Sequence, residues 1–170
     1  QAVKLNSNIV DLNYLQQIDY GDSTKINNLI EAFNEIQYFD STITTGSLFS
    51  AILADKVSKP KLDIINILNN YITLYPEDIK GYLYIANIYF EMENYLDAIF
   101  YYFRVLRINP FHIQANLDLA KCLINIKDYE GAISLLSNVY DLDDNNFDSK
   151  FYLGYSFFKL ENYNQAIKEF

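Results

Sequence analysis

Apolar residues recur along this chain at intervals of three and four, the spacing that places them on one face of an α-helix. In residues 78–92, for example, Tyr82, Ile85, Ala86 and Tyr89 share one face. The pattern predicts helices over residues 8–20, 26–39, 46–57, 62–75, 78–92, 95–108, 113–126, 129–142, 147–160 and from 163 onward. Only 5 Gly and 3 Pro are present, which also favours long helices over a sheet with many turns. We therefore expect an all-α protein.

One short phrase occurs three times at a fixed interval. A Tyr-x-x-Ala-Ile frame begins at Tyr95, Tyr129 and Tyr163, and the intervals are 129 − 95 = 34 and 163 − 129 = 34 residues. A fixed period of about 20 to 50 residues indicates a supersecondary unit that cannot bury its apolar face alone and stacks on its neighbours. Each unit here would be one pair of helices.

The spacing within a unit is that of a known repeat pattern. The pattern begins with an aromatic residue, has Leu and Gly three and four places later, and continues with Tyr, Ala, a second aromatic residue and Pro. The first unit carries these positions as Tyr82, Ile85, Ala86, Tyr89, Ala98, Tyr102 and Pro110. The second has Asn116, Leu119, Ala120, Leu123, Ala132 and Leu136, with Asp144 in place of Pro, and the third has Lys150, Leu153, Gly154, Phe157, Ala166 and Phe170. Residues 79–170 therefore resemble the tetratricopeptide repeat family.

This resemblance implies a right-handed α-solenoid of antiparallel helix pairs, the TPR superhelix. Its units are 79–112, 113–146 and a truncated 147–170. Counting back 34 residues from Pro110 reaches Pro76, so 45–78 is interpreted as a degenerate unit. Residues 1–44 form an N-terminal helical pair, either a diverged repeat or a cap of the kind that solenoids need. We expect the natural chain to continue beyond Phe170, because the last unit stops in its second helix.

Small residues occupy the places where the helices of such units approach closely. Ala86, Ala120 and Gly154 belong to the first helix of each unit, and Ala98, Ala132 and Ala166 to the second. A larger side chain at these positions would cost about 1 to 3 kcal/mol by overpacking. We therefore expect all six to be buried between helices.

By resemblance to the family, a ligand would bind the second, concave face of the first helix in each unit. Carried over by position, this face consists of Leu83, Asn87, Phe90, Leu117, Lys121, Ile124, Phe151, Tyr155 and Phe158, rimmed by Lys80, Gln114 and Asp148. Such a lining suits an apolar or aromatic anchor on a peptide or helix. The alternative is that some of these side chains contact the neighbouring helix and belong to the core.

Charge and composition narrow the classes of partner. The net charge of −9, from 13 basic and 22 acidic residues, disfavours nucleic acid and anionic lipid. The chain contains no run of 18 apolar residues, so we do not expect direct insertion into a membrane. Leu83, Asp118, Asp148 and Tyr152 stand where a clamp for chaperone tails needs Lys, Asn, Lys and Arg, so that ligand is disfavoured.

The sequence offers little for catalysis or metal binding. The single Cys122 excludes an intramolecular disulfide and a Cys-based zinc site, and the only histidine, His112, lies in a predicted turn. Residues 141–146 superficially resemble a calcium loop but lack its Gly, and Tyr152 replaces its final Glu. No glycine-rich phosphate loop is present. We expect no cofactor, no metal and no active site.

The sequence thus supports a non-enzymatic scaffold or adaptor that binds a protein or peptide in the concave groove. The alternative is a structural assembly arm that self-associates, as a homo-oligomer or larger assembly, or docks onto another domain of a larger protein. A third possibility is an enzyme whose catalytic domain lies outside this stretch. A soluble, cytoplasmic location is favoured, with an exported or periplasmic one as the alternative if a leader preceded Gln1.

Overall fold

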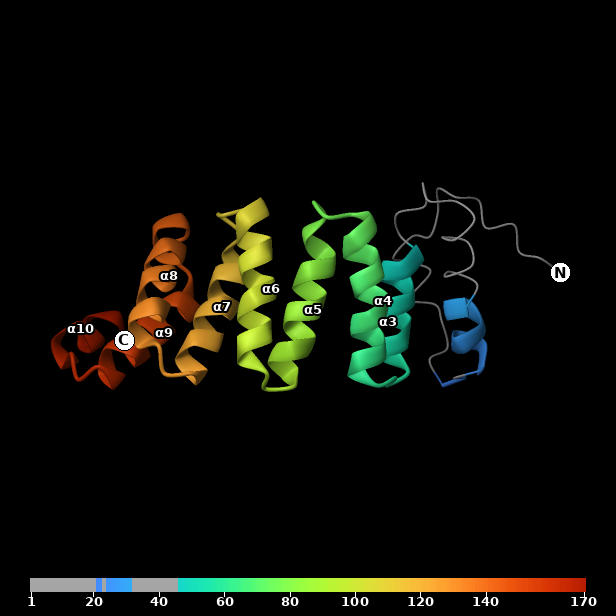
Figure 1. Ribbon diagram of the computed structural model, residues 1–170. Helices are drawn as coiled ribbons and strands as arrows, with labels where there is room; N and C mark the ends of the chain where they lie inside the picture. Colours follow the sequence, from blue (N-terminus) through green and yellow to red (C-terminus); the bar gives the residue numbers. More distant parts are fainter. Residues whose placement is uncertain (1–20, 23, 32–45) are drawn as a thin grey trace. The chain divides into compact units, whose positions relative to one another are not determined.

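A computed structural model describes residues 21, 22, 24–31 and 46–170 of the chain. Within these ranges the regular structure is helical, and short turns join the helices (Figure 1). Residues 24–31 are helical, and the helices that follow are α3 (Gly46–Lys56), α4 (Lys61–Leu74), α5 (Ile79–Glu91), α6 (Tyr95–Ile108), α7 (Ile113–Asn125), α8 (Tyr129–Leu142), α9 (Phe147–Lys159) and α10 (Tyr163–Glu169).

The helices predicted from residue 46 onward are thus confirmed, within one or two residues at each end. The predicted helix 8–20 and most of the predicted helix 26–39 lie outside the described residues. In the described ranges, none of the helices combines the length and the apolar character needed to span a bilayer.

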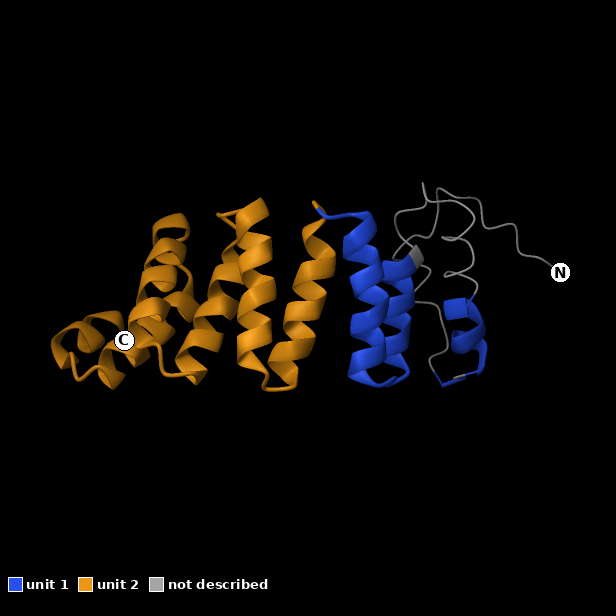
Figure 2. Cartoon of the chain, viewed as in Figure 1, with its two compact units in different colours: residues 1–76 blue, residues 77–170 orange. Residues whose placement is uncertain are grey.

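The chain divides into two compact units, residues 1–76 and residues 77–170 (Figure 2). In the first unit α3 and α4 pack against each other. Their shared core consists of fully buried side chains that include Leu53, Ile64 and Leu68, with Tyr71 2% exposed. This pair corresponds to the segment that the sequence indicates as a degenerate repeat.

In the second unit each helix packs against the next along the chain, from α5 to α10, and α7 also contacts α9. Figure 1 shows these helices side by side and alternating in direction. Contacts between consecutive elements, with a further contact one helix beyond, are the arrangement expected of stacked hairpins. The prediction of an all-α repeat fold is confirmed.

The small residues of the repeat lie where the helices meet. Ala86, Ala98, Ala120 and Ala132 are fully buried and Ala166 is 3% exposed. Around the central pair they are enclosed by larger side chains such as Leu123, Leu136, Val139 and Leu153. Gly154 is buried as well, and a Cβ atom built there would lie 2.9 Å from a ring carbon of Phe170. The predicted close approach is therefore confirmed.

The turn inside each hairpin has the same backbone in all three units. Glu93, Lys127 and Glu161 adopt left-handed φ angles of 58°, 68° and 59°. In the central unit the N–H groups of Lys127 and Asp128 donate to the carbonyls of Ile124 and Leu123, which completes the end of α7. The following residue then caps the next helix, and Asp128 accepts from the Gly131 N–H at 3.0 Å. This shared geometry accounts for the polar pairs that precede the three Tyr-x-x-Ala-Ile frames, Glu93-Asn94, Lys127-Asp128 and Glu161-Asn162.

Candidate protein-binding surface

On α9 three aromatic side chains of the predicted groove share one face of the helix. Phe151 and Phe158 are 45% and 52% exposed, and Tyr155 between them is half-buried. The Lys159 Nζ atom lies 5.4 Å from the centroid of the Tyr155 ring. The rings of Phe170 and Tyr163 on the α10 side lie 6.1 Å from Phe151 and 5.8 Å from Phe158, respectively. The result is an aromatic column that is held in place yet open to solvent.

On α5 the predicted groove residues are Leu83, Asn87 and Phe90. Leu83 and Phe90 are half-buried, and Asn87 is exposed. The Asn87 Oδ1 atom accepts a hydrogen bond from the Tyr102 hydroxyl at 2.6 Å. Burial, with smaller contributions from nearby acidic groups, raises the pKa of Tyr102 well above its ordinary value. Asn87 is therefore fixed by its oxygen, and its amide nitrogen is the group that can donate to a ligand.

On α7 the predicted residues take part in packing. Leu117 is 3% exposed and belongs to the core formed with Leu136 and Leu153, and Ile124 is half-buried against the same core. For Leu117 the structure therefore agrees with the alternative that the sequence left open, a core side chain in contact with the neighbouring helix. The first helix of the following unit covers it, because α7 also contacts α9.

Lys121, the one charged residue of the predicted groove, already has partners within the chain. Its Nζ atom lies 3.0 Å from Asp118 Oδ1 and 5.6 Å from the centroid of the Tyr152 ring. Burial alone would lower the pKa of Lys121, but the hydrogen bond and charge of Asp118 outweigh it and the pKa is raised. Of the rim residues, Lys80 and Asp148 are exposed, and Gln114 donates to Asp118 Oδ2 at 3.0 Å.

The residues with potential chemistry serve the fold. His112 is the N-cap of α7, where its Nδ1 atom accepts from the Ala115 N–H at 3.1 Å. Cys122 is fully buried, and burial raises the pKa of its thiol to about 12, so it is not an activated nucleophile. In the acidic turn, Asn146 caps α9 through the Ser149 N–H. Across the described ranges no cluster of His, Cys, Asp and Glu side chains is arranged to hold a metal ion.

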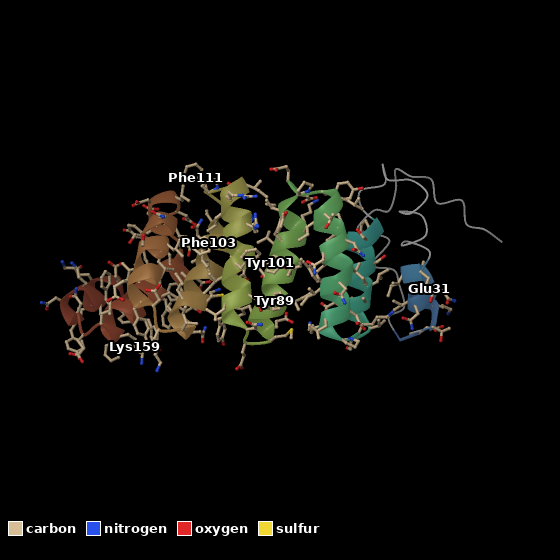
Figure 3. All side chains as sticks on the ribbon, viewed as in Figure 1. Glu31, Tyr89, Tyr101, Phe103, Phe111 and Lys159 are labelled. Atoms are coloured by element: carbon tan, nitrogen blue, oxygen red, sulfur yellow. The ribbon has the colours of Figure 1, made fainter. Side chains whose placement is uncertain are left out.

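The outer face of α6 is a candidate surface that the sequence reasoning missed. Leu96, Phe100 and Phe103 are 70%, 51% and 53% exposed, and they lie on the side of α6 opposite its buried residues Ala98, Tyr102 and Val105. Figure 3 labels Phe103 on α6, and also Tyr101, which stacks instead on Tyr89 of α5 at 5.6 Å. We call Leu96, Phe100 and Phe103 the α6 outer stripe.

A signal for this stripe was present in the repeat period. The residues 34 places further on are Glu130, Ser134 and Ser137, all exposed on α8. Comparing equivalent positions between units, rather than scanning each helix separately, would have identified α6 as the exception.

The comparisons with known proteins agree with this architecture. Residues 79–112 match the family model described as Tetratricopeptide repeat. Among solved structures, "Crystal structure of MamA" is 16% identical with a TM-score of 0.75, covering 90% of this chain and 91% of that one. "MamA 41-end from Desulfovibrio magneticus RS-1" is 12% identical with a TM-score of 0.72, covering 86% and 82%.

No curated protein sequence matches the chain. At these identities the likeness to the solved structures concerns the fold alone. Residues 79–112 thus form one tetratricopeptide repeat, and the same 34-residue register continues in the sequence through residues 113–170.

Proposed function

We propose that this chain is a non-enzymatic scaffold that binds an apolar or aromatic segment of a partner protein along the concave face of its helix pairs. The observation that carries this proposal is the aromatic column of Phe151, Tyr155 and Phe158 on α9. Two of its rings are about half exposed on one face of the helix.

The proposed groove combines this column with Leu83, Asn87 and Phe90 of α5. Rigid aromatic side chains provide a large contact area at low cost in conformational entropy, and they commonly anchor protein interfaces. Asn87, fixed by Tyr102, adds a donor for a peptide carbonyl. Because Lys121 is paired with Asp118, we expect little dependence of binding on a terminal carboxylate of the ligand.

A selection of displayed peptides against the chain, followed by calorimetric titration of the selected peptide, tests this proposal. We expect the variant Phe90→Ala/Tyr155→Ala/Phe158→Ala to bind at least about tenfold more weakly, which is 1.4 kcal/mol of binding free energy. A variant on the exposed face of α8, Ser134→Ala/Ser137→Ala, is the matched control and should bind like the wild type. Unchanged affinity of a folded triple variant would refute the groove.

A second candidate is a structural arm that self-associates or docks onto another domain. It is favoured by a hollow of about 200 Å³ lined by Phe147, Lys150, Phe151, Glu169 and Phe170. Phe147 and Phe170 are 78% and 70% exposed at its edge. If this candidate is right, sedimentation will show oligomers that Phe147→Ser dissociates; a monomer at all concentrations would exclude self-association.

A further inference from the structure

The α6 outer stripe is a continuous apolar surface on a helix whose other side is packed. Leu96, Phe100 and Phe103 follow one another at i, i+4 and i+7, which places them on one face. Phe100 and Phe103 are each about half exposed and Leu96 is 70% exposed. Single exposed apolar residues need no explanation, but a contiguous row of large ones on one helix commonly marks an interaction site.

The repeat itself supplies an internal comparison. The equivalent residues of α8 are Glu130, Ser134 and Ser137, and those of α4 are Leu62, Asn66 and Asn69. The fold therefore does not require apolar residues at the positions of Phe100 and Phe103, because α4 and α8 have Asn and Ser there; at the position of Leu96, α4 also has a leucine. The two phenylalanines are specific to the unit of α5 and α6.

The charges beside the stripe indicate the chemistry of a partner. The chain has 13 basic residues and a net charge of −9, yet its only two arginines, Arg104 and Arg107, both lie on α6. Arg107 follows Phe103 by four residues on the same face, and the Arg104 guanidinium carbon lies 5.1 Å from the centroid of the Phe100 ring. In the part of the chain that the structure describes, neither arginine forms an ion pair with a carboxylate.

A hollow lies beside the turn that follows α6. It measures about 300 Å³ and is lined by Pro110 and Phe111 from the turn after α6 and by Asn138, Asp141 and Leu142 of α8. Phe111, labelled in Figure 3, is 72% exposed. Asn138 and Asp141 are the α8 equivalents of Arg104 and Arg107, so the hollow opens on the same outer side as the stripe. It could receive one apolar side chain of a docked segment.

We propose that the α6 outer stripe, with Arg104 and Arg107, is a second docking surface that binds an acidic amphipathic helix of a partner protein. Apolar residues of that helix would pack on Phe100 and Phe103, and its carboxylates would pair with the two arginines. Arginine beside exposed aromatics is the combination enriched at the centres of protein interfaces. The guanidinium groups favour carboxylates in a bidentate geometry.

Helix stability alone does not explain this arrangement. Arg107 is in the last turn of α6 and so complements the helix dipole. That effect accounts for one charge and for none of the three apolar side chains. An interaction surface accounts for both.

The test uses the whole chain and two synthetic helical peptides, measured by fluorescence anisotropy. One peptide has leucines along one face flanked by glutamates, and in the other every glutamate is replaced by lysine. We expect the acidic peptide to bind at least about tenfold more tightly than the basic one. Its affinity should fall as salt is added, because salt screens the charges. Equal binding of the two peptides would overturn the proposal.

Variants of the stripe take the residues that α8 has at the same positions. Leu96→Glu/Phe100→Ser/Phe103→Ser should lose at least about tenfold in affinity for the acidic peptide. If circular dichroism shows that the triple variant is unfolded, Phe103→Ser alone is the milder variant. Arg104→Gln/Arg107→Gln should remove most of the preference for the acidic peptide. Wild-type affinity in a folded stripe variant would overturn the proposal.

Other occupants of the stripe give different results in the same set of experiments. A wild-type dimer in sedimentation that the stripe variants dissociate would mean that a second copy is the occupant. Co-sedimentation with phosphatidylglycerol vesicles that the stripe variants abolish would mean a lipid surface. Either result would overturn the proposal. The groove variant Phe90→Ala/Tyr155→Ala/Phe158→Ala should bind the acidic peptide normally, so failure of the groove and failure of the stripe are distinguishable.

Discussion

At the scale of single residues, Asn87 has two roles: it accepts a hydrogen bond from Tyr102 of the core, and it lies on the face proposed to bind a ligand. Tyr102 is 1% exposed and its hydroxyl donates to Asn87 Oδ1 at 2.6 Å. Asn87 itself is exposed on the face assigned to a ligand. The sequence identified Tyr102 as a position of the repeat pattern and Asn87 as a groove residue, but not that they contact each other. That contact depends on the crossing of α5 and α6, which the repeat period alone does not specify.

The two partners of this hydrogen bond should differ in their contribution to stability. Asn87→Ala leaves the buried Tyr102 hydroxyl without its acceptor, and we expect a loss of about 1 to 3 kcal/mol in the free energy of unfolding. Tyr102→Phe removes the hydroxyl as well, so the loss should be smaller, about 0.5 to 1.5 kcal/mol. Urea denaturation of both variants and of the double variant measures this difference. A larger loss for Tyr102→Phe would contradict the assignment.

The predicted groove also shows where reasoning at the residue scale stops. Leu83, Phe90 and Tyr155 are half-buried, Phe151 and Phe158 are about half exposed, and Leu117 is in the core. All these positions are equivalent in helical phase, so periodicity gives them one role. Their different burial arises from the size and position of the neighbouring helix, which a single-helix pattern does not contain. The sequence therefore predicted which residues occupy the groove positions, but not how exposed each of their side chains is.

At the scale of elements, the turn between the helices of each unit holds non-glycine residues in a conformation that favours glycine. Lys127 has a φ angle of 68°, and the residues at the equivalent position of the other two units, Glu93 and Glu161, have φ angles of 58° and 59°. Left-handed φ angles are unfavourable for residues with a Cβ atom. The helix-ending hydrogen bonds of the turn and the cap of the next helix hold the backbone there.

Replacing Lys127 by glycine should therefore stabilise the protein. We expect Lys127→Gly to raise the free energy of unfolding by about 0.5 to 1 kcal/mol, because relief of the left-handed strain exceeds the added entropy of the unfolded chain. Glu130→Gly, three residues further on in α8, is the control and should destabilise by about 1 kcal/mol. Thermal melting of both variants checks the pair. Destabilisation by Lys127→Gly would show that its side chain has a role that the backbone geometry does not indicate.

The element boundaries were predictable because each one has a local chemical cause. Pro60, Asn94, Asp128 and Asn146 immediately precede the helices whose starts they define. These residues are recognisable from the sequence alone, as N-caps or as a residue that suits a helix start. The outer face of α6 has no such local signature. Only the comparison between units makes Phe100 and Phe103 stand out.

At the scale of the whole molecule, stability should follow the stacking order of the helices in the second unit. α7 and α8 have packed helices on both sides, whereas α10 packs mainly on α9 and has only 7 residues. A helix that short is marginal without packing. In a repeat array, stability is approximately the sum of each unit and its contacts with its neighbours. The same repeat position should therefore contribute differently in the centre and at the edge.

Leu136 and Phe170 test this expectation, because they occupy the same repeat position. Leu136 is fully buried and Phe170 is 70% exposed. We expect Leu136→Ala to reduce the free energy of unfolding by about 2 to 5 kcal/mol, through lost burial and a cavity between α7, α8 and α9. Phe170→Ala should cost less than about 1 kcal/mol, because most of its ring is already in water. In Leu136→Ala, hydrogen exchange of backbone amides should be faster throughout α6, α7, α8 and α9. In Phe170→Ala it should be faster only in α10 and the adjoining part of α9. Equal losses in urea denaturation would contradict the different burial of the two side chains in the structure.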